Sequence, residues 1–156
     1  MSDVHQFFGI LRELKLSRHQ ALSQIGEDYA WQLDRDAVAQ MMRLAASTAL
    51  PIMCFVGSRG CIQIHSGPIR NVSTMGPWIN IFDETFHLHL RDDHVTDVWA
   101  VRRPTKDGHV TSVEAYDKDK NLIIQFFGKR HEGEAERPDW RRVAENLPRP
   151  SRPTAA

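Results

Sequence analysis

Three histidines stand at positions where they could bind a metal ion. His87 and His89 are two residues apart in the run Phe-His-Leu-His-Leu, and His65 ends the run Cys-Ile-Gln-Ile-His. Residues two apart on a β-strand share a face, and two imidazoles on one face can chelate a transition metal. No carboxylate pattern accompanies them, and polar residues on the wetter face of a sheet explain the spacing more simply. A metal site is therefore the alternative interpretation.

Several other polar residues could bind an anion or a cofactor. Arginine forms paired, charge-assisted bonds to carboxylates. Arg18 lies on the second predicted helix, Arg103 ends a predicted strand and Arg130 follows the last strand. Each alone is most simply a solvated surface charge. His5, just ahead of two phenylalanines, is on its own most simply a surface or cap residue in the first turn of a helix.

Nucleophilic catalysis has little support in the sequence. Cys61 and Ser66 lie near His65, but no Gly-x-Ser-x-Gly motif is present. The segment 57–60 predicts a turn rather than a phosphate-binding loop, because no Lys-Ser/Thr pair and helix follow it. Cys54 and Cys61 are the two cysteines, and their strand-like surroundings predict reduced thiols rather than a disulfide.

Strands must position most of these side chains. Residues 51–91 consist of short runs rich in Ile, Val, Phe and Thr, broken by Gly, Pro, Ser and Asn. This pattern predicts consecutive antiparallel strands joined by tight turns. Three longer strands are expected over 94–103, 109–116 and 122–127, with turns at 104–108 and 117–121. Gln125 and Phe127 are two apart on the last of these strands, so they share a face.

Helices are predicted at both ends of the chain. Apolar spacing and cap residues predict helices over 3–15, over 17–25, from Asp34 or Asp36 to just before Pro51, and over 138–146. A turn or short strand is expected over 27–33. The tail 148–156 carries three prolines and is expected to be disordered.

Together these elements predict an α+β fold. An antiparallel sheet of roughly seven to nine strands would be covered on one side by the N-terminal helices, with a C-terminal helix docked beside it. The length of 156 residues favours one domain, expected over 1–147. Lys+Arg and Asp+Glu are both 20, which argues against a nucleic-acid partner. No run is long and apolar enough for a membrane span, and residues 1–3 begin no signal peptide, so a cytoplasmic protein is expected.

Long motifs in this order along the chain carry a family resemblance. They lie at residues 57–68, 75–80, 88–93, 101–105, 107–108, 110–112 and 125–130. Together they resemble the bacterial haem-utilisation or hemin-degrading proteins of the HemS/HmuS/ChuS type, over about residues 3–147. Those family members usually consist of two tandem repeats, and this chain is similar to the second repeat only.

The resemblance implies a haem site. His5 stands where the family has its axial haem-iron ligand, a role that suits a neutral imidazole. Arg18, Arg103 and Arg130 stand at positions that contact the haem propionates.

Two further residues, Gln125 and Phe127, lie on the haem side according to the same resemblance. Two departures from the family pattern concern this site. Position 103 is commonly Lys and is Arg here, which keeps the charge. Position 127 is commonly an aromatic residue with a hydroxyl and is Phe here, which removes a hydrogen bond to the haem edge.

The function implied is cytoplasmic haem binding and transfer in bacterial haem-iron acquisition, between an importer and a haem-accepting protein. One alternative is a haem-degrading, oxygenase-like enzyme. The other is a non-haem metal protein that uses His65, His87 and His89. A lone repeat would leave the surface that packs against the other repeat exposed, so a homodimer or pairing with a first-repeat half is expected.

Overall fold

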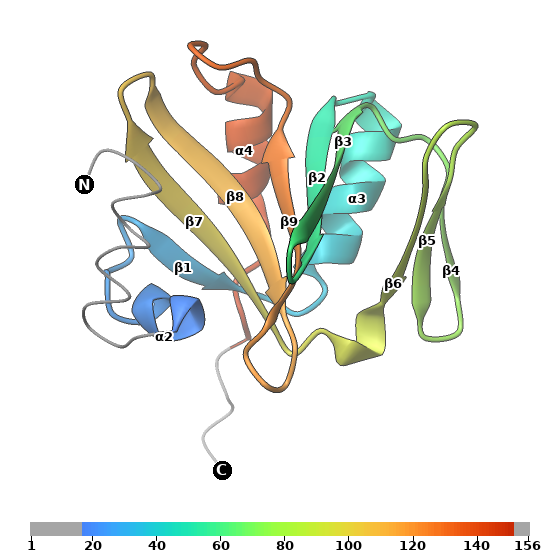
Figure 1. The fold of residues 1–156 in the computed structure, drawn as a ribbon, viewed down its shortest axis with the longest axis horizontal. Coiled ribbons are helices and arrows are strands. Elements are labelled where there is room, and N and C mark those ends of the chain that lie inside the picture. Colours follow the sequence, from blue (N-terminus) through green and yellow to red (C-terminus); the bar gives the residue numbers. More distant parts are fainter. Residues whose placement is uncertain (1–16, 152–156) are drawn as a thin grey trace.

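The computed structural model describes residues 17–151, which contain nine strands and three α-helices (Figure 1). The elements in chain order are α2 (Arg18–Leu22), β1 (Ala30–Leu33), α3 (Ala37–Thr48), β2 (Ile52–Ser58), β3 (Cys61–Gly67), β4 (Val72–Met75), β5 (Trp78–Phe82), β6 (His87–Arg91), a 3-10 turn η1 (Asp92–His94), β7 (Asp97–Thr105), β8 (Gly108–Tyr116), β9 (Leu122–Gly128) and α4 (Pro138–Asn146).

The strands form two antiparallel sheets. The larger has six strands in the order β1-β7-β8-β9-β2-β3, and the smaller has three in the order β4-β5-β6. Every neighbouring pair is antiparallel. In the large sheet, the pairs β2–β3, β7–β8 and β8–β9 are formed by consecutive strands, and β2 also pairs with β9. Figure 1 shows α3 lying between the two sheets.

One face of the large sheet carries the main hydrophobic core. Alternate strand residues such as Val113, Ile124 and Phe126 point to this face and are almost completely buried. They pack against Met41 and Met42 of α3 and against the small sheet, so apolar burial holds the two sheets together around one helix.

The helix α4 packs on this same face through Trp140. The side chain of Trp140 is fully buried, and its Nε1 donates a hydrogen bond to the carbonyl of Thr111 at 2.9 Å. Gly128 at the end of β9 permits this close approach, because a Cβ there would lie 2.5 Å from Cγ of Trp140. The predicted bounds of α4, with Pro138 in the first turn, are confirmed.

The opposite face of the large sheet is covered over only part of its width. The helix α2 lies over β1, β7 and β8, where Leu22 packs with Ala30, Val101 and Tyr116 in a small second core. The predicted capping box is present: Ser17 accepts from the amide of Gln20, and the Gln20 side chain accepts from the amide of Ser17. The helix ends at Leu22, three residues before the predicted end at residue 25.

The predicted fold class is confirmed, since nine antiparallel strands with flanking helices are present over residues 17–151. The short strand expected within 27–33 is β1. The predicted helix over 3–15, which includes His5, lies outside the described residues. The single-domain limits and the disordered tail stay predictions, although Pro148 accepts a hydrogen bond from the amide of Asp34 at 2.7 Å.

Candidate functional site

A buried carboxylate organises the half-covered face of the large sheet. Glu114, in the middle of β8, has no exposed surface. From the described part of the chain it accepts six hydrogen bonds, donated by Arg18 (two), Arg103, Ser112, Tyr116 and Gln125. A carboxylate has about four lone-pair sites, so Glu114 cannot accept all six of these hydrogen bonds with good geometry.

Three strands and one helix bring these donors together. Glu114 faces Gln125 across the β8–β9 pair, and Ser112 and Tyr116 flank it at two-residue spacing on β8 itself. The Gln125 amide donates at 2.6 Å, Ser112 Oγ at 2.7 Å and Tyr116 Oη at 2.7 Å. The sheet therefore supplies three neutral donors to one charge, which stabilises the ionised carboxylate.

Arg18 reaches the same carboxylate from α2. Its Nη2 lies 2.5 Å from Oε2 of Glu114, and its Nε lies 3.0 Å from Oε1. This two-pronged geometry is the strongest form of an arginine–carboxylate pair. Because Arg18 is the first residue of α2, the ion pair fastens the start of that helix to the sheet.

Arg103 approaches Glu114 from β7 and is held less firmly. Its single bond, from Nη2 to Oε2 of Glu114, is 3.3 Å long. Its Nε is buried and has no hydrogen-bond partner among the described residues. A buried guanidinium nitrogen without an acceptor costs free energy, so this side chain is suited to receive a further anionic acceptor.

The electrostatics of the cluster favour an anion. Burial acts to raise the pKa of Glu114, but the Arg18 guanidinium and the hydrogen bonds outweigh burial, so the pKa lies below its ordinary value. Burial, reinforced by the adjacent Glu114 charge, raises the pKa of Tyr116, so its hydroxyl remains a donor. Two guanidiniums against one carboxylate leave one net positive charge at this part of the face.

An apolar hollow adjoins Arg103 on the uncovered part of the face. Its volume is about 320 Å³, and it is lined by Met53, Phe55, Arg103, Thr105, Val110, Phe127, Gly128, Arg130 and Glu132. The rings of Phe55 and Phe127 meet edge to face at 5.1 Å. Arg130, at the rim, donates to the carbonyl of Glu134 at 2.8 Å. These surroundings match a flat apolar molecule with anionic groups, because aromatic rings and two arginines line the same hollow.

The apolar surface continues beyond the hollow onto β3. Ile64 lies opposite Phe55 and Ile62 lies opposite Gly57, so both isoleucines point to the same face of the sheet. They are 53% and 60% exposed, which is high for isoleucine. We call Met53, Phe55, Ile62, Ile64 and Phe127 the apolar shelf.

Five of the six predicted site residues thus lie on one face. Arg18, Arg103 and Gln125 meet at Glu114, while Phe127 and Arg130 line the hollow beside it. The sixth, His5, lies outside the described residues. Glu114 was not among the residues predicted from the sequence, although the spacing of Ser112, Glu114 and Tyr116 at every second position of one strand was a signal for a polar row on one face.

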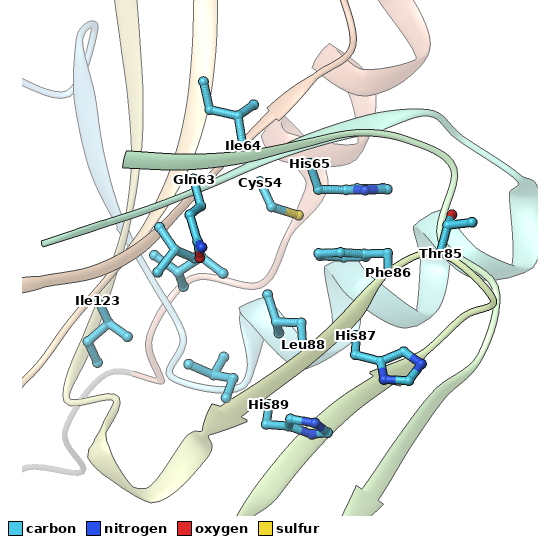
Figure 2. Close-up of a pocket in the computed structure, with 13 residues that line it drawn as sticks. Cys54, Gln63, Ile64, His65, Thr85, Phe86, His87, Leu88, His89 and Ile123 are labelled. Atoms are coloured by element: carbon cyan, nitrogen blue, oxygen red, sulfur yellow. The ribbon is translucent and has the colours of Figure 1, made fainter. Parts of the chain in front are cut away.

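A second, larger cleft lies between the edges of the two sheets (Figure 2). Its volume is about 680 Å³, with β3 on one side and the strand β6 with the residues before it on the other. The rings of His65 and Phe86 stack at 3.8 Å across it. Cys54 lies in its floor, where burial raises the pKa of the thiol to about 12. Both cysteines are free, as predicted.

All three histidines of the metal interpretation border this cleft, but their rings have different neighbours. His65 is stacked on Phe86, whereas His87 and His89 contact Phe82 and alternate along the chain with Phe86 and Leu88. His89 is also hydrogen-bonded through Nδ1 to Asn80 Oδ1 at 2.8 Å. Among residues 17–151, no group of three or more His, Cys, Asp or Glu side chains is placed to hold a metal ion.

Comparison with known proteins places this arrangement in a family. The model of the haemin-degrading HemS/ChuX domain matches residues 15–147. The hemin transport protein HmuS of Yersinia pestis is 43% identical over 141 residues, which are 90% of this chain and 41% of the relative. The chain therefore spans less than half the length of this relative.

Two solved structures share the fold closely. The heme-binding protein PhuS of Pseudomonas aeruginosa, in its apo form, matches with a TM-score of 0.92 and 44% identity, over 94% of this chain and 43% of PhuS. The Escherichia coli heme oxygenase ChuS matches with a TM-score of 0.91 and 41% identity, over 94% of this chain and 45% of ChuS. In the described range, no helix is long and apolar enough to span a membrane.

Proposed function

The chain belongs to the family of haemin-degrading HemS/ChuX domains, and we propose that it binds haem on the half-covered face of the large sheet and passes it on during bacterial haem-iron acquisition. The observation that carries this proposal is the hollow in which Phe127, Arg103 and Arg130 meet. Haem is a flat apolar macrocycle with two carboxylates at one edge, and this hollow offers apolar rings beside two cations.

The residues present fit the ligand on chemical grounds. Phe55 and Phe127 provide apolar ring surface, and Met53 provides an adaptable thioether beside them. The partnerless Nε of Arg103 and the net positive charge around Glu114 suit a carboxylate. Phe127 has no hydroxyl, so it contributes contact area and no hydrogen bond.

We further propose His5 as the residue that ligates the haem iron. A neutral imidazole is the commonest protein ligand of haem iron. His5 precedes, in the sequence, the helix α2 that lies over the same face as the arginines. When bound, haem supplies an iron centre that binds axial ligands, while Arg103 and Arg130 hold its carboxylates.

Transfer is preferred over degradation because the relative HmuS is described as a hemin transport protein. Degradation is the second candidate, since ChuS, at 41% identity, is described as a heme oxygenase. With ascorbate as electron donor and air as the source of O₂, we expect slow haem loss that catalase suppresses. Rapid, catalase-resistant conversion to a single tetrapyrrole product would instead establish the enzyme.

The location and the assembly are also proposals. Two free thiols suit a reducing compartment, and we place the protein in the cytoplasm. The relatives that match at more than 40% identity are over twice as long as the matched region, and the apolar shelf is open in this chain. A second copy of the chain, or a first-repeat half, would cover it. An importer and a haem acceptor complete the expected partners.

A titration of haem into the purified protein, followed in the Soret region, tests the proposal. We expect a saturable spectrum that differs from that of free haem, at about one haem per chain. A parallel titration with zinc or nickel checks the metal alternative. A spectrum that remains that of free haem at excess protein would rule out the proposed function.

A further inference from the structure

The helices α3 and α4 border an open groove on the face of the large sheet opposite to the hollow. The volume of the groove is about 510 Å³. Leu44 on α3 and Val143 on α4 give it apolar walls, and Leu147 and Pro148 extend it beyond the end of α4. Leu44 is 42% exposed, which is high for leucine. The groove is therefore an apolar surface that the described part of the chain leaves in contact with water.

Each helix presents one stripe of side chains to this groove. On α3, Arg43 and Leu44 follow Gln40 by three and four positions, which places all three on one side of the helix. On α4, Arg142 and Asn146 are four positions apart and line the groove together. The buried residues of both helices are different ones, so each helix carries a second stripe beside its core-facing stripe.

The two arginines of the groove make no ion pair. Arg43 and Arg142 are exposed, and neither side chain forms a hydrogen bond or a salt bridge with residues 17–151. Arg141, the neighbour of Arg142 on α4, is instead paired with Glu136 at 2.9 Å. Burial raises the pKa of Asp92, and the charge of Arg43 opposes that rise through space without a salt bridge. No carboxylate is among the described residues that line the groove, so two positive charges stand beside its apolar walls.

The shape of the groove suits a third helix. α3 has 12 residues and is therefore about 18 Å long, which matches about three turns of a helix laid along it. A helix in such a groove buries a stripe of apolar residues spaced at three and four positions. Leu44 and Val143, on opposite walls of the groove, would contact that stripe.

The charge of the groove selects an acidic partner. Acidic side chains beside the apolar stripe of the docked helix would give Arg43 and Arg142 carboxylate acceptors. A membrane surface fits less well, because anionic lipids are recognised by clusters of about four to eight cations, and this groove has two arginines. A second copy of the chain also fits less well, because two grooves joined by a two-fold axis would bring the arginines of both copies together.

We propose that the groove between α3 and α4 is a docking site for an acidic amphipathic helix of a partner protein. Arg43 and Arg142 are the cations that select the partner, and Leu44 and Val143 are its apolar contacts. Because the groove and the hollow lie on opposite faces of the large sheet, a docked partner leaves the hollow open to its ligand. This inference does not depend on the proposed haem function.

The probe for this test is a designed, fluorescently labelled peptide of about four helical turns. It carries Leu at a spacing of three and four positions and Glu on both sides of that stripe, and a second peptide carries Lys at each Glu position. Fluorescence anisotropy with the ligand-free chain measures the two dissociation constants, and amide NMR shifts locate the bound peptide. The variants are Arg43→Glu, Arg142→Glu and the double variant. Arg59→Glu is the matched control, because Arg59 is exposed in the turn between β2 and β3 and makes no ion pair with the described residues.

The parent chain should bind the Glu peptide more tightly than the Lys peptide, and the largest amide shifts should lie in α3 and α4. Arg43→Glu and Arg142→Glu should each weaken binding of the Glu peptide about 5-fold or more. The double variant should prefer the Lys peptide, because the charges on both sides are then exchanged. Arg59→Glu should change neither affinity, and added salt should weaken binding of the Glu peptide to the parent.

Three results with the peptides would overturn the proposal. A parent chain that does not bind the Glu peptide lacks the docking site, and one that binds both peptides equally has no charge selection. Amide shifts on the apolar shelf in place of α3 and α4 would put the peptide on the other face. If a charge reversal does not fold, Arg43→Gln and Arg142→Gln replace it and should weaken binding of the Glu peptide in the same direction.

Two other occupants of the groove have their own signatures, and each would contradict the proposal. Self-association of the parent that Arg43→Glu abolishes, measured by light scattering, would make the groove an interface between copies. Binding to vesicles of phosphatidylglycerol and phosphatidylcholine that the double variant loses, without binding of the Glu peptide, would make it a lipid site.

Discussion

The guanidinium of Arg18 and the carboxylate of Glu114 form a two-pronged ion pair between residues 96 positions apart in the sequence. The Arg18 side chain is 15% exposed and the Glu114 side chain is not exposed, so the carboxylate of the pair is shielded from water. This pair joins α2 to β8. It connects the helix that precedes the sheet with the strand on which the polar cluster is built.

A double-mutant cycle on this pair should reveal strong coupling. Arg18→Gln or Glu114→Gln alone should lower the free energy of unfolding by about 3–5 kcal/mol, because each leaves a buried charge without its partner. The double variant should lose much less than the sum. Urea denaturation of the ligand-free protein measures these values.

The pair of Arg102 with Glu145 is the matched control for that cycle. Its side chains are 23% and 40% exposed, so its coupling should be about 0.2–1 kcal/mol. Equal coupling in both cycles would show that Glu114 is not a buried anchor.

The stability of the protein should fall in acid partly because of Glu114. Its pKa in the folded state is below the ordinary value of 4.5, so the folded state binds the proton less readily than the unfolded state. The contribution of the Glu114 carboxylate to the stability of the folded protein is therefore complete above pH 4.5. It is lost as the pH falls through the pKa that Glu114 has in the folded state. Asp97, beside Lys120 and His19, acts in the same direction because those partners outweigh burial and lower its pKa.

The measurement is Tm as a function of pH for the parent and for Glu114→Gln. We expect the parent to lose its advantage over the variant progressively as the pH falls below 4.5. Parallel curves for the two proteins would contradict the proposed ionisation of Glu114.

A single methyl group at Gly128 should disturb the packing of α4. A Cβ there would lie 2.5–2.8 Å from three atoms of Trp140, which is fully buried. Gly128→Ala should therefore lower the free energy of unfolding by about 1–3 kcal/mol or more through overpacking. Gly57→Ala on β2, where the nearest atom would lie 3.6 Å away, is the control and should be nearly neutral. A neutral Gly128→Ala would mean that Trp140 moves away freely.

The open apolar shelf predicts self-association. Light scattering of the ligand-free chain at tens of micromolar, a range typical of weak association, should give the mass of a two-fold dimer. Replacing Ile62 and Ile64 by Ser should shift the protein toward monomer, because both are more than half exposed on the shelf.

The control for that experiment is Leu44→Ser. Leu44 lies on α3, away from the shelf, and is 42% exposed. Its substitution should leave the mass unchanged. A clean monomer for the parent chain would refute the pairing.

The sequence predicted the elements of the fold well because their signals are local. The strand runs and their turns, the Ser17–Gln20 capping box and Pro138 at the start of α4 are each decided within a few residues, and each is confirmed. The buried side expected from alternation at Ile62 and Ile64 is wrong, because both side chains are more than half exposed. The separation of nine strands into two sheets depends on the packing of α3 between them. No local pattern encodes such packing.

The sequence did not indicate the carboxylate around which several of the predicted site residues gather, and their role in binding stays a prediction. Family resemblance assigned Arg18, Arg103 and Gln125 to one side, and the structure brings all three to a carboxylate that sequence reasoning did not select. Glu114 is a charged residue in an apolar strand, and its role depends on partners up to 96 positions away. The spacing of residues within one segment of the sequence does not indicate a partner that is so far away along the chain.

The most direct test of the haem account is the Soret spectrum of His5→Ala titrated with ferric haem, beside His87→Ala and His89→Ala as controls. The two control histidines contact Phe82 of the small sheet and do not line the hollow with Arg103 and Arg130, so they should not affect the iron. If His5 ligates the iron, only His5→Ala should change the position of the Soret band, with about 10-fold or greater loss of affinity. An unchanged spectrum and affinity in His5→Ala would contradict the account.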